Sequence, residues 1–258
     1  SPNYLENGNF SWKLIVISYK MNGISGDIGK GRYKMTYYVQ LFRFIFNRRD
    51  HVLRIREAER VANLWRTSAV LMLASIILYA WMGYLGMGAG LLSADAPLLS
   101  TYQYEQSKLW FMIGRAVYGL IFAVFILFVP SLLFYYVTEI PYEKLVVMQQ
   151  VVLVVLLFER LLWVPLTIFS GLDWYTSVFS LGIIASYLTE IDWVIYFFGA
   201  ISIFQVGVIW FVYRYLRSLS DVRSNLLLLV VILFFVIGWA LAATIAVTDY
   251  NMISGWFA

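Results

Sequence analysis

Long stretches without a single charged residue dominate this chain of 258 residues. Four gaps between charges hold 28, 23, 21 and 25 uncharged residues, and they run from 67 to 94, 116 to 138, 193 to 213 and 224 to 248. Residues 145–172 form a fifth stretch, which only Glu159 and Arg160 interrupt. A helix needs roughly 20 apolar residues to cross a hydrocarbon core of about 30 Å. The pattern predicts an all-α, polytopic membrane helix bundle with spans at 67–91, 112–137, 145–170, 191–213 and 225–247.

The composition narrows the function classes. Only 13% of the residues are charged, against about 25% in an ordinary soluble domain. There is no cysteine and one histidine, His51, which excludes thiol catalysis and a histidine-rich metal site within one chain. No metalloprotease, nucleophile-elbow or phosphate-loop motif is present. We expect no enzyme activity, no cofactor and no metal; a membrane-bound hydrolase is the least favoured function.

The basic residues predict the orientation in the membrane. With the N-terminus inside, segments 43–66, 138–144 and 214–223 lie inside and carry seven, one and three Lys or Arg residues. The outside segments carry only Lys108 and Arg115. Because cytoplasmic loops are enriched in Lys and Arg, this favours a cytoplasmic N-terminus and an outside C-terminus in the cell membrane. The same rule explains the net charge of +4 without a nucleic-acid partner.

Three regions follow one another along the chain. Residues 1–34 are polar and mixed, and are either a flexible cytoplasmic tail or a segment foreign to the native protein. Residues 35–66 are expected to form an interfacial aromatic helix, at 36–46, and then a basic juxtamembrane helix, while residues 67–250 form the membrane domain. Segment 92–111 is expected along the interface, and 174–189 as a re-entrant or interfacial helix rather than a sixth crossing. The predicted contacts with lipid or a partner are Arg43, Arg48, Arg49, Arg54, Arg56, Arg214, Arg217 and Arg223.

Glu159 and Arg160 form the candidate polar site. Each ionised side chain near the middle of a membrane helix costs about 2.5–3.5 kcal/mol, so both need partners. Neighbours on a helix diverge by about 100°, so we expect the two side chains to point toward different helices. Gln149 lies close to three turns before Arg160 and on its face. Two readings stay open: a polar path for an ion, proton or headgroup, and a buried polar contact that fixes helix register.

Small residues and one further arginine complete the candidates. Gly238, Ala242 and Ala246 recur every four residues, which predicts a flat helix face for packing inside the bundle or against a second subunit. Arg115, at the outer mouth of its span, is either an interfacial anchor or a ligand for lipid phosphate or another anion.

The last third of the chain carries a family resemblance. Residues 199–210, GAISIFQVGVIW, and 213–223, YRYLRSLSDVR, are followed by a final apolar helix. This pattern resembles the bacterial Yip1-type integral membrane proteins, over residues 36–247. The resemblance implies five spans and a role as an accessory protein of ABC-type exporters of toxins or antimicrobial peptides. It also implies that the two arginine-rich segments, 43–66 and 214–223, contact the partner.

These observations lead to two functional hypotheses. The first is a non-enzymatic accessory or assembly subunit of a membrane transport complex, whose partners are lipids and other membrane subunits. The second is a small transporter or channel that uses Glu159 and Arg160 along its path.

Overall fold

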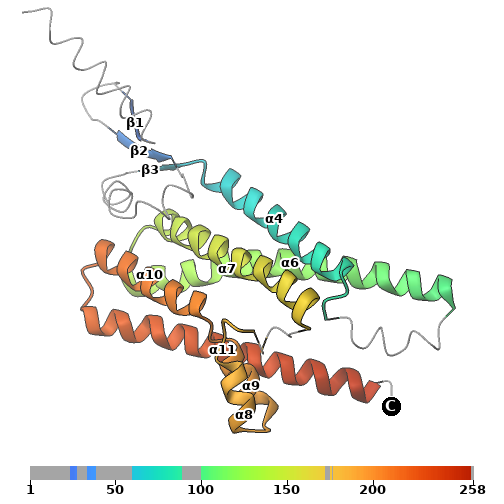
Figure 1. The fold of residues 1–258 in the computed structure, drawn as a ribbon. Helices are drawn as coiled ribbons and strands as arrows, with labels where there is room; N and C mark the ends of the chain where they lie inside the picture. Colours follow the sequence, from blue (N-terminus) through green and yellow to red (C-terminus); the bar gives the residue numbers. More distant parts are fainter. Residues whose placement is uncertain are drawn as a thin grey trace, which may run out of the picture.

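The computed structural model describes residues 24–27, 34–38, 60–88, 100–171, 175 and 177–256 (Figure 1). Within these ranges the chain is all-α apart from three short strands. The strands are β1 (Ile24–Asp27), β2 (Lys34–Tyr38) and β3 (Arg60–Ala62). The helices are α4 (Leu64–Tyr84), α6 (Thr101–Thr138), α7 (Tyr142–Ser170), α8 (Gly182–Leu188), α9 (Asp192–Gly199), α10 (Ile203–Leu219) and α11 (Ser224–Trp256).

Four helices are long and apolar enough to cross a membrane: α4, α6, α7 and residues 224–248 of α11. They coincide with four of the five predicted spans. The first ends earlier than predicted, at Tyr84, because the chain turns at Gly86 and Gly88, which adopt φ angles of 76° and 79°. The second begins earlier, at Thr101, so residues 101–111 continue α6 and do not form the separate interfacial segment predicted for 92–111.

The predicted span 191–213 is not a continuous helix. α9 ends at Gly199, and α10 begins at Ile203 after Ser202, whose hydroxyl accepts a hydrogen bond from the Gln205 backbone N–H. Such a side-chain cap starts a new helix because it satisfies a free N–H of the first turn. In the described part of the preceding segment, residues 177–189, the helix is α8, whose seven residues are too few to cross a membrane, so this part forms no sixth crossing.

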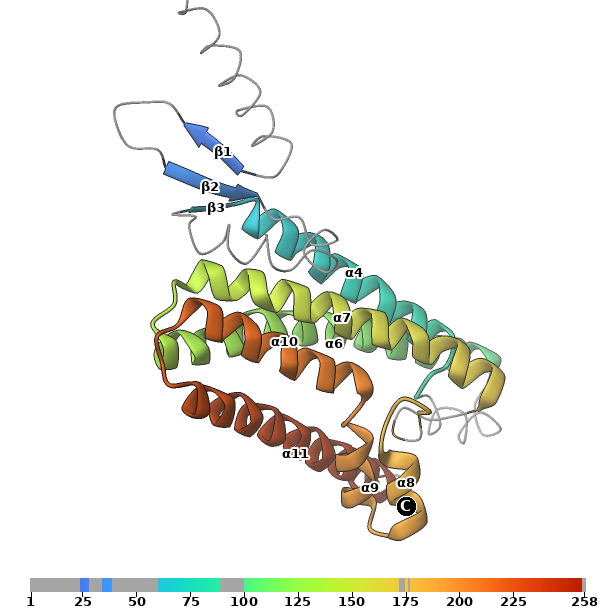
Figure 2. The ribbon, with the colours of Figure 1, turned by 60° about the vertical axis from the view of Figure 1, so that its left-hand side comes forward.

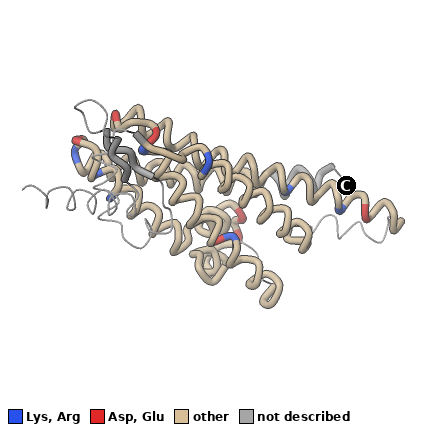
Figure 3. The backbone as a smooth tube through the Cα atoms, turned by 90° about the horizontal axis from the view of Figure 1, so that it is seen from above, with Lys and Arg blue, Asp and Glu red and all other residues tan. Residues whose placement is uncertain are grey.

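The long helices run back and forth (Figure 2). α4, α7 and α11 begin at the same end of the bundle at which α6 and α10 finish. We call this end the basic end, because it carries the cations Arg66, Lys144, Arg214, Arg217 and Arg223. Most of the length of the helices carries no charged residue at all (Figure 3).

The N-terminal region differs from its prediction. β2 pairs antiparallel with β1 and parallel with β3. Residues 36–38 and 60–62 are strands. The predictions of an interfacial helix at 36–46 and of a basic helix that ends at residue 66 are therefore wrong at these positions. Tyr37, Tyr38 and Val61 have high β-propensity, which outweighs the amphipathic pattern at these positions. Residues 39–59 lie outside the described residues, and they include Arg43, Arg48, Arg49, Arg54 and Arg56.

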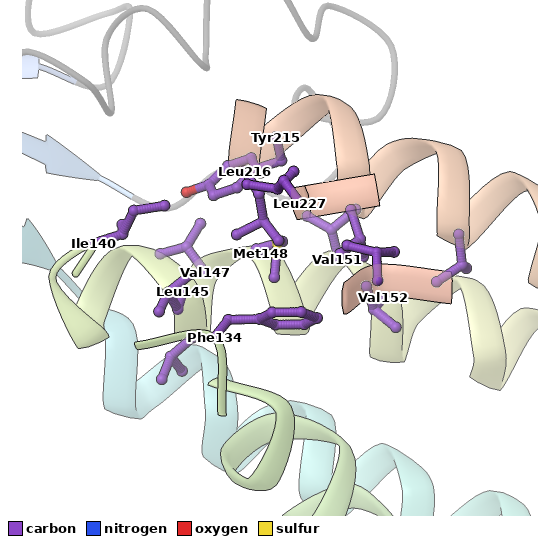
Figure 4. Close-up of a cluster of buried hydrophobic side chains, with 14 of the residues drawn as sticks. Phe134, Ile140, Leu145, Val147, Met148, Val151, Val152, Tyr215, Leu216 and Leu227 are labelled. Atoms are coloured by element: carbon purple, nitrogen blue, oxygen red, sulfur yellow. The ribbon is translucent and has the colours of Figure 1, made fainter. Parts of the chain in front are cut away.

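α7 is the central helix of the bundle. Every residue from Leu145 to Leu153 is buried, so this part of α7 is covered on all sides. The largest core cluster gathers around it from other helices, with Phe134 of α6, Leu216 of α10 and Leu227 of α11 (Figure 4). Because other helices surround α7, Glu159 and Arg160 in its second half can face different neighbouring helices.

Candidate functional site

The helical repeat of α7 separates Glu159 from Arg160. Arg160 lies on the face of Leu153 and Leu157, which pack with α4 and α6 in one core cluster. Glu159 lies on the face of Val152 and Leu156, which belong to the cluster shared with α10 and α11. The two charges therefore face different helices.

Arg160 lies against aromatic rings. Its guanidinium carbon is 3.7 Å from the ring centroid of Trp163 and 5.8 Å from that of Phe122. The guanidinium also comes close enough to the Tyr79 hydroxyl to interact with it. A cation over an aromatic face is stabilised by about 0.5–2 kcal/mol, more when water is excluded. The rings of Phe122 on α6 and Trp163 on α7 and the hydroxyl of Tyr79 on α4 thus surround the Arg160 guanidinium, in place of a carboxylate of the described chain.

Arg115 of α6 approaches the ring of the same tyrosine. Its guanidinium carbon lies 5.8 Å from the Tyr79 ring, 5.9 Å from the Tyr118 ring and 6.0 Å from the Phe111 ring. Its stem is held in place by α4, because a Cβ added to Gly83 would lie 3.1 Å from the Arg115 Cβ and Cγ. We call Tyr79, Arg115, Tyr118, Phe122, Arg160 and Trp163 the arginine–aromatic cluster.

Two hydrogen-bonding atoms in this region have no partner within the described chain. They are Nε of Arg115 and Oε2 of Glu159, and both are buried. Buried polar atoms in native structures nearly always have a hydrogen-bond partner, from protein or ordered water. The region therefore has unused donor and acceptor capacity on two sides of α7.

Glu159 lies at the level where the α9–α10 segment is broken. Its chain neighbour Phe158 packs edge-on against Phe204, in the first turn of α10, with centroids 6.2 Å apart. Phe179, before α8, contacts the same Phe204 ring at 5.7 Å. The side chain of Glu159 is 3% exposed, so this carboxyl group is nearly removed from the outside of the bundle.

Close backbone contacts build the break itself. A Cβ on Gly182 would lie 1.8 Å from the Tyr175 carbonyl oxygen and 2.9 Å from the Gly199 Cα. Two backbone hydrogen bonds then join the segments: Leu181 N–H donates to the Ile201 carbonyl at 3.1 Å, and Ile203 N–H donates to the Phe179 carbonyl at 3.0 Å. Non-helical backbone at membrane depth is tolerated where protein buries it in this way.

Gln150, next to Gln149 of the predicted polar site, connects α7 to α4. Its Nε2 donates to the Leu64 carbonyl and to the Ser68 hydroxyl, both at 2.9 Å, and the side chain is fully buried. Gln149 is buried as well, but it forms no side-chain hydrogen bond with the described residues. Gln149 and Arg160 lie in one continuous helix, eleven positions apart and therefore on the same face.

The small-residue stripe lies on an open face. Gly238 and Ala242 are exposed, Ala246 is half-buried, and no atom lies within 4 Å of a Cβ built on Gly238. The described chain therefore supplies no internal partner at Gly238, although packing inside the bundle was the expected role. The second expected role, contact with another subunit, is the one that this exposure permits.

The arginines at the end of α10 are held locally. Arg214 lies 5.6 Å from the Trp210 ring centroid, and Arg217 donates to the Tyr213 hydroxyl at 3.4 Å. A 2.7 Å hydrogen bond joins the hydroxyls of Tyr213 and Ser224 and so ties α10 to α11. Arg223, just before α11, is exposed. These cations are available at the basic end for anionic lipid or a partner.

No group of three or more His, Cys, Asp or Glu side chains that could hold a metal ion occurs in the part of the chain that the structure describes. Comparisons of the chain with protein-family models, curated proteins and solved structures give no match.

Proposed function

We propose that this protein is a non-enzymatic, multi-pass subunit of a larger complex in the cell membrane, and that α11 provides the face on which a partner helix docks. One observation carries the proposal: the core-facing stripe of α11 continues beyond the bundle. Leu227 and Val231 are fully buried in the core, and Gly238 and Ala242 follow them at helical spacing on the same face, where they are exposed.

A transmembrane helix is the occupant that this face fits. Lipid chains are as apolar as the helix, so apolarity alone does not bring helices together in a membrane. Small residues instead allow close backbone approach, which is how helices associate there. The exposed stripe is flat at Gly238 and Ala242 and continuous with an internal packing face, as a helix interface should be.

The proposal includes the membrane topology. The α9–α10 segment acts as an interrupted fifth crossing, and the basic end lies on the cytoplasmic side, in keeping with the positive-inside rule. Arg214, Arg217 and Arg223 then contact anionic lipid or a cytoplasmic part of the partner. The Yip1-type resemblance of residues 199–223 supports an ABC-type exporter as the complex.

Engineered cysteines test the docking face cleanly, because the chain has no cysteine of its own. Gly238→Cys or Ala242→Cys, treated with a short thiol or thiol–amine cross-linker in native membranes, should give a stoichiometric product with a different membrane protein. Gly207→Cys is the matched control: Gly207 lies in α10, is exposed and has no atom within 4 Å of an added Cβ. A product at Gly207 as strong as at Gly238, or a product of twice the chain's own mass, would contradict the proposal.

A second candidate is a small transporter, favoured by the broken segment beside Glu159. Transporters often place a broken helix at the binding site near the middle of the membrane. Under this alternative, the purified protein alone moves an ion or proton across liposomes, and Glu159→Gln abolishes the flux at unchanged folded yield. Glu190→Gln is the control, since Glu190 is exposed in the connection between α8 and α9. Absence of flux through the wild-type protein would exclude this alternative.

A further inference from the structure

We infer that the arginine–aromatic cluster binds the phosphate group of an anionic phospholipid headgroup, near the end of α4 that lies opposite the basic end. This site is separate from the docking face on α11 and does not depend on it. The inference rests on the charge of the cluster, on its unused donors and on its place along the helices.

The cluster holds two cations and no described anion. Neither Arg115 nor Arg160 has a carboxylate of the described chain within 4 Å. Glu159, although next to Arg160 in sequence, lies on the other face of α7. Charges withdrawn from water are stable only when they are paired. Aromatic faces offset part of the cost for each guanidinium, but no carboxylate of the described residues compensates the positive charge of the cluster.

Both arginines of the cluster approach Tyr79. This residue is 3% exposed, the Arg115 guanidinium carbon lies 5.8 Å from its ring centroid, and the Arg160 guanidinium interacts with its hydroxyl. Nε of Arg115 is buried without a partner. A guanidinium presents its N–H groups as a planar fork that matches two oxygens of a phosphate. Two such forks and a phenol hydroxyl supply enough donors for one phosphate group.

The location favours a lipid as the source of the phosphate. Tyr79 and Gly83, which contact Arg115, lie in the last two turns of α4, close to where the helix leaves the apolar region. Tyr118 is 52% exposed, so the cluster opens toward the outside of the bundle, which lipid covers in a membrane. Tyrosine and tryptophan favour the headgroup level.

Lipid-dependent thermal stability tests the inference on the full chain. The purified protein is placed in nanodiscs of phosphatidylglycerol or of phosphatidylcholine, or in detergent with inorganic phosphate. We expect a higher melting temperature in phosphatidylglycerol, and a gain at least halved by Arg115→Gln and by Arg160→Gln. Lys108→Gln, a charge change at the same end outside the cluster, should retain most of the gain. Arg160→Lys keeps the charge and provides a second variant if Arg160→Gln fails to fold.

Each other outcome overturns the inference. Equal stability of the wild-type protein in the two lipids would show that no anionic headgroup is bound. An equal gain with inorganic phosphate would assign the site to a soluble anion and reject the lipid. Asp95 and Asp173 follow α4 and α7 in sequence and lie outside the described residues. If Asp95→Asn or Asp173→Asn destabilises the protein in detergent as much as the arginine variants do, a carboxylate of the chain is the counter-ion.

Discussion

The α4–α6–α7 half of the bundle and the α9–α11 half are held together by different means. In the first half, Ser75 Oγ donates to the Gly119 carbonyl at 2.7 Å, and Gln150 bridges α7 to the start of α4. The second half has close contacts at the break, but most of its longest helix is not covered by other helices. In the most apolar 18-residue stretch of α11, 17% is buried inside the protein, against 33% in the corresponding stretches of α4, α6 and α7. The helices of the first half are therefore more fully buried against one another than α11 is in the second.

This difference has a physical reason. Inside a membrane, close backbone approach and hydrogen bonds between helices supply most of the association energy. In the first half, small residues and hydroxyl groups take part in contacts between its own helices. The second half keeps Gly238 and Ala242 on an exposed face, so that its own small residues remain free for another helix. The contrast therefore supports a subunit role more directly than any single residue does.

Gly119→Val should break the first half most strongly. An added Cβ would lie 2.9 Å from the Ser75 carbonyl oxygen and 2.9 Å from the Tyr79 Cβ, so α4 and α6 must separate. We expect a loss of about 3 kcal/mol, the upper part of the range for overpacked cores. Unfolding in mixed detergent micelles, followed by tryptophan fluorescence, measures it. Gly114→Val is the control, since Gly114 lies in the same helix with no atom within 4 Å; an equal loss there would refute the close-approach argument.

Sequence reasoning predicted the class and four spans because both depend on long apolar runs. It failed at the α9–α10 break, where the uncharged run continues through the interruption. A local signal was present: Ser202 and Gln205 match the Ser-x-x-Gln spacing of a helix start, as Ser100 and Gln103 do before α6. In both cases the serine cap stands directly before the first helical residue, whereas hydropathy gives no signal of where the helix begins.

Gln150→Leu should have the next largest effect. It removes two buried hydrogen bonds to α4, and interhelical hydrogen bonds in membranes contribute about 0.6 kcal/mol each on average, up to about 1.7. We expect a loss of about 1–2 kcal/mol in the same unfolding assay. Gln149→Leu is the matched control at the adjacent buried position and should change stability by less than about 0.5 kcal/mol. If Gln149→Leu costs more than Gln150→Leu, the assignment of the α4–α7 link is wrong.

The candidate site was predictable in outline and not in its partners. The 100° step of a helix separates Glu159 from Arg160 whatever surrounds them. Tyr79 and Phe122 are neighbours of Arg160 because of how α4 and α6 pack. Neither the hydrophobic periodicity nor the charge pattern of these two helices encodes that packing. Arg115 was predicted as an interfacial anchor or a ligand for lipid phosphate or another anion, without a link to Arg160. Its role in the cluster emerges only from the approach of Gly83, which no local pattern specifies.

Ser75→Ala should weaken the first half slightly. The lost hydrogen bond joins two helices, and alanine fills the buried position without a clash, so we expect about 0.6–1 kcal/mol. Ser131→Ala is the control because the Ser131 hydroxyl, also fully buried, donates to the Leu127 carbonyl within its own helix at 2.6 Å. That bond can persist when helices separate in the unfolded state, so its loss should cost less. Equal losses would show that the interhelical bond has no special weight.

The smallest expected effect lies in the second half, at the contact between α9 and α11. Trp193 Nε1–H donates to the Thr244 hydroxyl at 3.1 Å, and both groups are exposed. A double-mutant cycle with Trp193→Phe and Thr244→Val isolates this bond, because phenylalanine retains an aromatic ring against Phe197, which stacks on Trp193 at 5.4 Å. We expect a coupling energy of about 0.5 kcal/mol or less. A value above that measured for the Ser75 contact would mean that α9 is fixed to α11 as firmly as α4 is to α6. The second half would then be a closed unit, and the exposed stripe of α11 would be part of a rigid surface instead of the edge of a loosely packed one.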